Sequence, residues 1–257
     1  MAEEETVSGL GLLRVAATAA LANYVNDHFA MIGFQAYLWR MIVNVDYGHG
    51  DPVKFPAPGE PAPPESAVGQ MTSHSQYLNE MMFCRGVNSF QTYLAELLTL
   101  IFEARPETLK SQKMVTREFC VEHHAANDLI AALAKQTVDE LAYRSLKDVA
   151  RFFEKTLRLP LFTKKEDLEK TALQVDIRNI ITHNRGIVDT FFVQRHPGFS
   201  NEVGHPILIE RDSETGEQVG GLLFFARQLD MRAIQKFGLP TLLPQGGLQS
   251  SEHNDIG

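Results

Sequence analysis

Apolar side chains recur every three or four residues along most of this chain, and this spacing predicts amphipathic helices. Prolines, glycines and short polar clusters separate the helical stretches. The segments with helical spacing are Leu10–Val45, Ser75–Ala104, Phe119–Ala134, Asp139–Leu157 and Lys165–Arg195. The last segment is expected to run unbroken until Pro197 and Gly198 stop it.

Polar residues and prolines divide the chain. Asn23, Asn26, Asp27 and Gly33 interrupt the first segment and predict that it bends or forms two helices. Six prolines lie within residues 48–72, and proline fixes φ and removes a hydrogen-bond donor. The predicted organisation is a helical segment (1–47), a proline-rich linker (48–72), a helical domain (73–240) and a disordered tail (241–257).

Near the C-terminus the pattern changes. Two apolar runs, Pro206–Arg211 and Val219–Phe225, flank the polar stretch Asp212–Gln218. Such runs around a Glu-Thr-Gly turn predict a β-hairpin over about residues 206–225. A short helix, Ala226–Phe237, is expected to follow and to end at Gly238. The predicted fold class is all-α, an up-and-down helical bundle with a small C-terminal β-hairpin.

Composition and charge limit the partners and the cellular compartment that can be expected. Hydrophobic residues make up 44% of the chain and the net charge is −8, so nucleic acid would have to bind a local basic patch. No segment reaches the ~18 uninterrupted apolar residues of a membrane span, and the start Met1–Glu5 is acidic, unlike a secretory signal. The two cysteines, Cys84 and Cys120, are expected to be free buried thiols. These features predict a cytoplasmic protein without a membrane partner.

The candidate chemistry lies in Asp176–Asp189, which contains Arg178 and, five residues later, His183. Arginine binds phosphate with a planar fork, and histidine transfers protons near neutral pH. On an ideal helix these two side chains lie about 140° apart. Between them lie Asn179, Thr182 and Gly186, and a glycine within a helix, costing roughly 1 kcal/mol, suggests close approach of a ligand. Asn184 falls in the apolar stripe and needs a hydrogen-bond partner.

Because Arg178 and His183 diverge within one helix, two helices facing each other across a two-fold axis would bring both pairs into one cleft. The motif therefore predicts a composite site in a homodimer. An alternative is that this polar face is simply solvated, with Arg185 paired to Asp189 one turn later.

The stretch from Arg178 to Asp189 resembles the signature of HEPN domains, R-x4-6-H with a polar residue directly after the arginine. Its continuation from Asn184 is similar to the RiboL-PSP-like ribonuclease branch. Phe90–Lys110 resembles the first long helix of that branch, and Leu229–Gly238 resembles its C-terminal extension. The resemblance covers about residues 75–240. It implies a HEPN-like helical core, dimerisation through the motif helices and, in many members, metal-independent RNA cleavage in toxin–antitoxin, phage-defence or RNA-processing systems.

If the resemblance extends to activity, Arg178, His183 and Asn179 are the catalytic residues, and Thr182 and Arg185 bind substrate. His183 would transfer a proton, Arg178 would bind the phosphate, and Asn179 would position the phosphate or the imidazole. Attack by the ribose 2′-OH leaves a 2′,3′-cyclic phosphate, without cofactor or metal. The expected partners are RNA, a second copy of the chain and an antitoxin or other regulator.

Two other functions stay open. Some HEPN members are inactive or only bind nucleotides, so the chain could be a non-catalytic nucleotide-binding or protein-interaction module. It could also be a structural helical domain. A metal site at Glu122-His123-His124 is not favoured, because adjacent side chains on a helix point about 100° apart.

Overall fold

The computed structural model describes residues 16–47, 66–109, 114–199, 202–209 and 214–242. Within these ranges the regular structure is helical, with two isolated β-bridges and no strand, which confirms the all-α class. The elements are α1 (Ala19–Tyr47), α2 (Ala67–Ser73), α3 (Ser75–Ala104), a 3₁₀ turn (Pro106–Leu109), α4 (Arg117–Glu122), α5 (Ala126–Ala142), α6 (Leu146–Lys155), α7 (Lys165–Asn184), α8 (Thr190–Arg195) and α9 (Glu214–Phe237).

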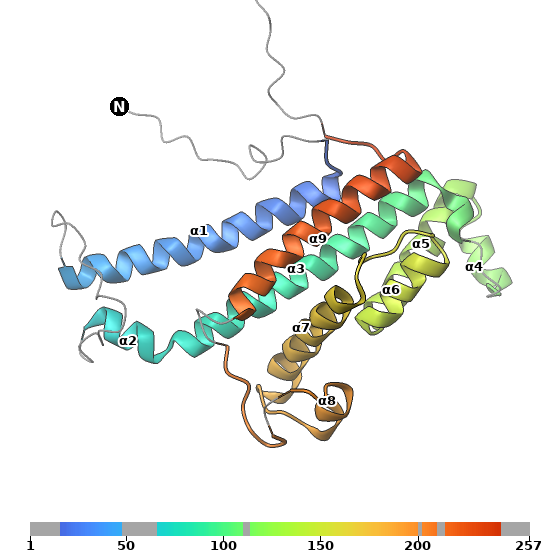
Figure 1. Ribbon diagram of the computed structural model, residues 1–257. Helices are drawn as coiled ribbons and strands as arrows, with labels where there is room; N and C mark the ends of the chain where they lie inside the picture. The colour runs from blue at the N-terminus through green and yellow to red at the C-terminus, as the bar shows by residue number, and fades with distance from the viewer. Residues whose placement is uncertain (1–15, 48–65, 110–113, 200–201, 210–213, 243–257) are drawn as a thin grey trace, which may run out of the picture.

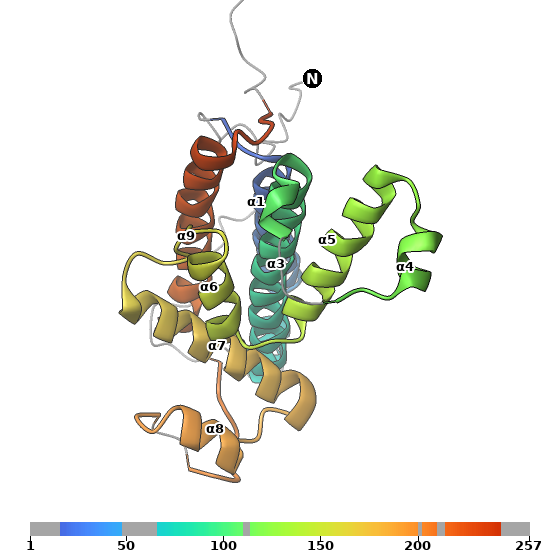
Figure 2. The ribbon, with the colours of Figure 1, turned by 90° about the vertical axis from the view of Figure 1, so that its right-hand side faces the viewer.

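The long helix α3 is the centre of the fold. Helices α1 and α9 lie along it, and α5 and α7 also pack against it (Figures 1 and 2). Helix α6 packs against α7, while α4 and the start of α5 project away from the other helices (Figure 2). Because α3 contacts most other helices, its side chains are buried around much of its circumference. Any site on α7 is therefore positioned by α3.

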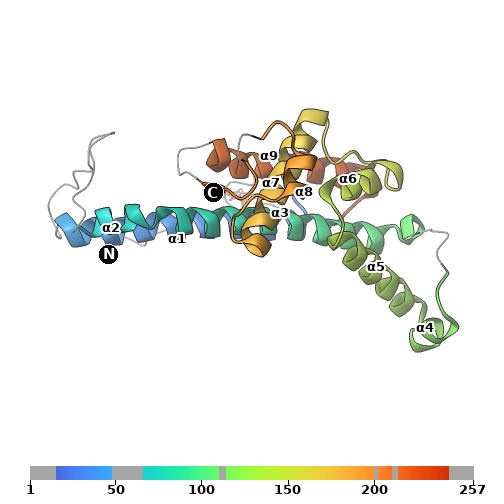
Figure 3. The same cartoon turned by 90° about the horizontal axis from the view of Figure 1, so that it is seen from below.

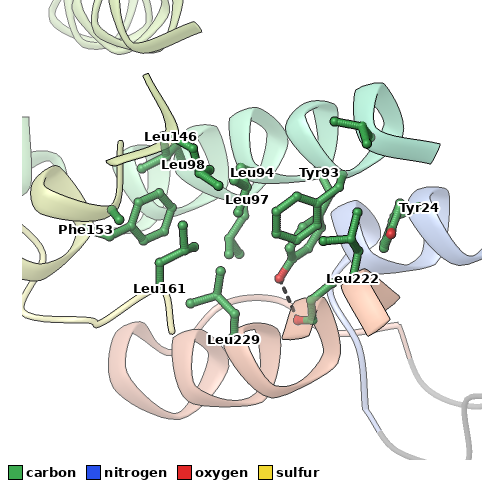
Figure 4. Close-up of a cluster of buried hydrophobic side chains, with 14 of the residues drawn as sticks. Tyr24, Tyr93, Leu94, Leu97, Leu98, Leu146, Phe153, Leu161, Leu222 and Leu229 are labelled. Atoms are coloured by element: carbon green, nitrogen blue, oxygen red, sulfur yellow. Dashed lines mark hydrogen bonds between the residues drawn. The ribbon is translucent and has the colours of Figure 1, made fainter. Parts of the chain in front are cut away.

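The core lies where α3, α6 and α9 meet (Figure 4). Leu97 of α3, Phe153 of α6 and Leu229 of α9 are 0–1% exposed. The one polar link in this view is the Tyr93 hydroxyl, which donates to the Ala226 carbonyl oxygen at 2.9 Å. A buried hydroxyl needs such a partner, so this bond fixes α9 against α3.

Helix α1 is continuous, and the predicted bend or division does not occur. Two of the polar residues that suggested it bind α3 instead: Asn23 Nδ2 donates to Glu96 Oε2 at 3.2 Å, and Asp27 accepts from Arg85 and Ser89. Gly33 alone costs roughly 1 kcal/mol relative to alanine, which is too little to break a helix this long. Helix contacts with α3 therefore overrode the local signals.

The end of α1, together with α2 and the first turns of α3, extends beyond the other helices (Figures 1 and 3). Five large apolar side chains of α1 are exposed: Ile32, Phe34, Tyr37, Met41 and Val45. Despite this apolar character, none of the helices in the described ranges meets the length and hydropathy that crossing a membrane requires.

The structure describes only parts of the predicted linker and tail. Helix α2 lies largely inside the predicted linker of residues 48–72, where Ser66 caps its N-terminus by accepting from Gly69 N at 2.9 Å. Residues 48–65 of that linker, and 243–257 of the predicted tail, lie outside the described residues. Leu242, at the start of the predicted tail, lies within the described residues, and its N donates to the Ala17 carbonyl oxygen at 2.8 Å. The N-terminal segment packs on α3 and α9 through α1.

The predicted β-hairpin is wrong for the described residues. Val219–Phe225 belongs to α9, and the run Pro206–Ile209 is extended but does not pair with it. The buried residues Leu222, Ala226, Leu229 and Ala233 recur at helical spacing, so the apolar run continues the buried face of the following helix. A short apolar run cannot be assigned to strand or helix by its own periodicity.

Candidate functional site

The motif helix ends eleven residues earlier than expected, because α7 stops at Asn184 and α8 begins only at Thr190. Arg185 adopts a left-handed conformation (φ 54°), and Gly186 N donates to the Ile180 carbonyl oxygen at 3.1 Å. Two successive left-handed residues, Arg185 and Gly186, therefore end the helix, and both of their N–H groups donate to the Ile180 carbonyl oxygen. Asn184 is exposed and donates to the Ile187 carbonyl oxygen at 2.5 Å, so it is not part of an apolar face.

Gly186 therefore has another role than the one predicted. It does not lie within a helix, and its φ of 77° belongs to the left-handed region that favours glycine. A Cβ added there would meet only Glu80 Oε1, at 4.0 Å. The need for glycine is conformational, and close approach of a ligand is not required to explain it.

The chain after Gly186 is held by backbone pairing. Ile207 N donates to the Gly186 carbonyl oxygen at 2.8 Å, and Val188 N donates to the His205 carbonyl oxygen at 3.0 Å. Helix α3 binds the same extended segment, because Gln76 Oε1 accepts from Ile209 N at 3.0 Å. The C-terminal end of α7 is consequently fixed relative to α3.

Arg178 points toward α3 and is half-buried. Its Nη2 donates to Gln91 Oε1, whereas its buried Nε has no hydrogen-bond partner. Within the described residues no carboxylate lies at ion-pair distance from it. Burial lowers the pKa of Arg178, although the nearby Cys84 opposes this. A half-buried cation without a counter-ion is a ready binding site for an anion.

Thr182 lies one turn further along α7, is exposed, and lies near the Cys84 thiol of α3. Burial raises the pKa of Cys84, while the nearby Thr182 side chain and the charge of Arg178 lower it to a smaller degree. The thiol is therefore neutral at physiological pH, and it forms the wall of the site beside Arg178 and Thr182. Both cysteines are free, as predicted, but each is only half-buried.

The remaining predicted site residues are spread around the end of α7. His183 and Arg185 are exposed, and Asn179 is half-buried. Arg185 does not pair with Asp189 as the alternative interpretation proposed; Asp189 caps α8 by accepting from Phe192 N at 2.7 Å. Arg178 thus faces α3, whereas His183 faces solvent, within a single chain.

Asp176 precedes the motif and joins α7 to the end of α8. It accepts from Arg195 Nη1 at 2.9 Å and lies 2.8 Å from His196 Nε2. His196 and Asp176 are nearly buried, and these contacts hold the loop that follows the motif. Asp176 is therefore already engaged and does not orient His183.

A cavity of about 320 Å³ lies beside Arg178. Helix α3 contributes the polar side chains of Asn88, Gln91 and Thr92, and α5 and α6 contribute an apolar wall that includes Leu141 and Val149. Such a combination of apolar walls with a few polar groups is typical of small-molecule sites.

Three residues of α3 that complete the site were not predicted from the sequence: Cys84, Asn88 and Gln91. They follow one another at intervals of four and three along α3. This polar stripe was a usable signal, because side chains at such intervals lie on one face. Which residues of other helices this stripe contacts could not be inferred, since Arg178 and Gln91 are 87 positions apart in the sequence.

His123 also has a local structural partner. Its Nδ1 lies 3.1 Å from the Phe119 carbonyl oxygen, and its ring stacks on the Phe119 ring. Among the described residues, no group of three or more His, Cys, Asp or Glu side chains is arranged to hold a metal ion.

Comparison with known proteins adds no relative: no protein-family model, no curated protein and no solved structure matches the chain. The geometry of the described residues is therefore the basis for a functional proposal.

Proposed function

We propose that this protein is a metal-independent endoribonuclease of the HEPN type, acting as a toxin or phage-defence effector. The observation that carries the proposal is Arg178: a half-buried arginine whose Nε is unpartnered and whose charge has no carboxylate partner among the described residues. A phosphodiester would supply both the missing negative charge and acceptor oxygens. The resemblance of Arg178–His183 to the R-x4-6-H signature supports the same chemistry.

In the proposed reaction the ribose 2′-OH attacks the neighbouring phosphorus and the bond to the 5′-oxygen breaks. The products are a 2′,3′-cyclic phosphate and a 5′-hydroxyl. Arg178 stabilises the charge that develops on the phosphate oxygens. His183 transfers a proton, either from the attacking hydroxyl or to the leaving oxygen. Asn179 positions the phosphate or the ring, while Thr182 and Arg185 extend the phosphate contact.

We further propose that the active form is a homodimer in which the ends of two α7 helices meet. Arg178 faces α3 and His183 faces solvent. A second copy of the chain would bring arginine and histidine side chains from both copies into one site. Two large apolar residues, Tyr77 and Met81, are 68% and 63% exposed on α3. Tyr77 lies two turns and Met81 one turn before Cys84 on the same helical face, which would place them beside the site within such an interface.

The catalytic proposal is tested by digesting single-stranded RNA in the presence of EDTA. Wild-type protein should cleave it, and His183→Ala and Arg178→Ala should each lower the rate by at least about 100-fold. His124→Ala and Arg117→Ala, which remove exposed residues of the same types from the α4 region, should cleave normally. Equal rates for all five proteins would overturn the assignment, and thermal unfolding would verify that each variant is folded.

The dimer is tested by sedimentation with two matched substitutions. Met81→Glu alters the face beside the site, and Phe34→Glu alters the exposed face of α1. The proposal expects Met81→Glu to be monomeric and inactive while Phe34→Glu remains dimeric. The reverse result, with dimers lost only in Phe34→Glu, would place the interface on α1 and overturn the composite site.

A non-catalytic nucleotide-binding or protein-interaction module is the second candidate, because the net charge of −8 disfavours free RNA away from the site. It predicts that the wild-type protein binds nucleotides through Arg178 without cleaving RNA under any condition.

A further inference from the structure

The cavity beside Arg178 has walls of two kinds. The α3 wall offers amide and hydroxyl groups from Asn88, Gln91 and Thr92, whereas the opposite wall is aliphatic apart from Arg144. Its volume of about 320 Å³ falls at the lower end of the ~300–1,000 Å³ typical of small-molecule sites. The cavity therefore suits a small, flat group with apolar faces and polar edges.

Arg178 connects this cavity to the phosphate-binding position, because the same side chain lines the cavity and carries the unpartnered Nε. Gln91 accepts from Arg178 through Oε1, which leaves its amide N–H groups as donors. Asn88 provides both a donor and an acceptor. Amide side chains can distinguish bases through paired hydrogen bonds to their edges.

We propose that this cavity holds the nucleobase of the nucleotide whose phosphate lies on Arg178, and so selects the base next to the cleaved bond. This inference rests on the proposed function for its substrate. The base lies between the aliphatic side chains, and Asn88 and Gln91 read its edge. Recognition of unpaired bases splayed into protein pockets is the usual route to sequence specificity on RNA.

The cavity can be filled without changing Arg178 or the polar wall. Ala95 of α3 lines it and is half-buried, and leucine is also a good helix former, so Ala95→Leu should fold. The matched control is Ala36→Leu on the exposed face of α1. Both proteins carry the same chemical change on a long helix.

The substrates are four DNA oligonucleotides, each with one ribonucleotide (rA, rC, rG or rU) at the same position. Cleavage needs a 2′-OH, so each can be cut only there. Wild type and Ala36→Leu should prefer one base over the poorest by about tenfold or more. Ala95→Leu should reduce this preference to within about threefold. Equal cleavage of all four substrates by wild type, or a preference unchanged in Ala95→Leu, would overturn the inference.

A binding experiment separates this inference from the catalytic proposal. The four nucleoside monophosphates are titrated into His183→Ala by calorimetry, with and without Ala95→Leu. Base-dependent binding that Ala95→Leu abolishes supports the pocket even if the wild type never cleaves RNA, in which case only the nuclease proposal fails. RNA cleavage with base-independent nucleotide binding would leave the nuclease proposal standing and overturn the base pocket, as would tighter binding of inorganic phosphate than of any nucleotide.

Discussion

Arg178 of α7 donates a hydrogen bond to Gln91 of α3, and this contact holds a guanidinium between two helices without neutralising it. An amide oxygen satisfies one N–H group but carries no charge. The positive potential of Arg178 is therefore retained beside the cavity, and a glutamate at the same position would have removed it.

We predict that Gln91→Glu lowers RNA cleavage and phosphate affinity by at least about tenfold, because the introduced carboxylate pairs with Arg178 and competes with the substrate phosphate. The shape of the side chain is preserved, so the free energy of unfolding should stay equal or rise. Rates measured against Gln136→Glu, the same change at an exposed glutamine of α5, would show whether the effect is specific. Wild-type phosphate affinity in Gln91→Glu would contradict the role of an uncompensated Arg178.

Alanine substitutions at two glycines should change the free energy of unfolding in opposite directions. Gly186→Ala is expected to lower the free energy of unfolding by about 1–2 kcal/mol, because Gly186 has a φ of 77°. Gly33→Ala should raise it by up to about 1 kcal/mol, because Gly33 lies inside α1 with nothing within 4 Å of an added Cβ. Urea unfolding of both variants measures the difference, and a stabilised Gly186→Ala would argue against the helix-terminating role.

The pair Thr18 and Asp230 links α1 to α9 and should make stability depend on pH. Asp230 accepts from Thr18 N at 3.0 Å and from Thr18 Oγ1 at 2.5 Å, and both residues are fully buried. Burial raises the pKa of Asp230, although the two bonds oppose this. Because the folded state holds the proton more tightly, stability should fall as pH rises from the usual aspartate range through the raised pKa, and then level off.

Asp230→Asn should remove that pH dependence, because an amide can bind both Thr18 groups without ionising. Asp230→Ala should cost about 1–3 kcal/mol, since it leaves the buried Thr18 N–H without a partner. Thermal unfolding across pH 4–8 measures both effects. Stability of Asp230→Asn that changes with pH in parallel with wild type would show that another group is responsible.

Cys84 provides a chemical probe of the site. Burial raises its pKa, so a maleimide should label it slowly at neutral pH and faster as pH rises. Because Cys84 lies beside Thr182 and Arg178, the bulky adduct should abolish RNA cleavage. Cys84→Ser should retain activity after the same treatment, and full activity of labelled wild type, with labelling verified by mass spectrometry, would exclude Cys84 from the site wall.

Helical periodicity was sufficient to predict the all-α class and the presence of most helices. Each of those helices carries an apolar face at three- and four-residue spacing, which is a local property of the chain. The end of α7 was also readable in principle, because Asn184-Arg185-Gly186 is a typical helix C-terminal signal. The helix end was not predicted because the apolar residues Val188 and Phe192 continue the helical spacing by coincidence. In the structure both are buried, but Val188 lies in the loop after α7 and Phe192 lies in α8.

Local periodicity along the chain is enough to show that it is helical and that Arg178, Asn179, Thr182 and His183 lie near one another along one helix. Long-range packing makes Val219–Phe225 part of a helix, brings Arg178 to Gln91 and forms the cavity beside them. Helices α3 and α7 cross at that point and join residues 87 positions apart. The burial of Arg178 and the absence of a carboxylate partner among the described residues depend on that crossing, and no local pattern encodes them.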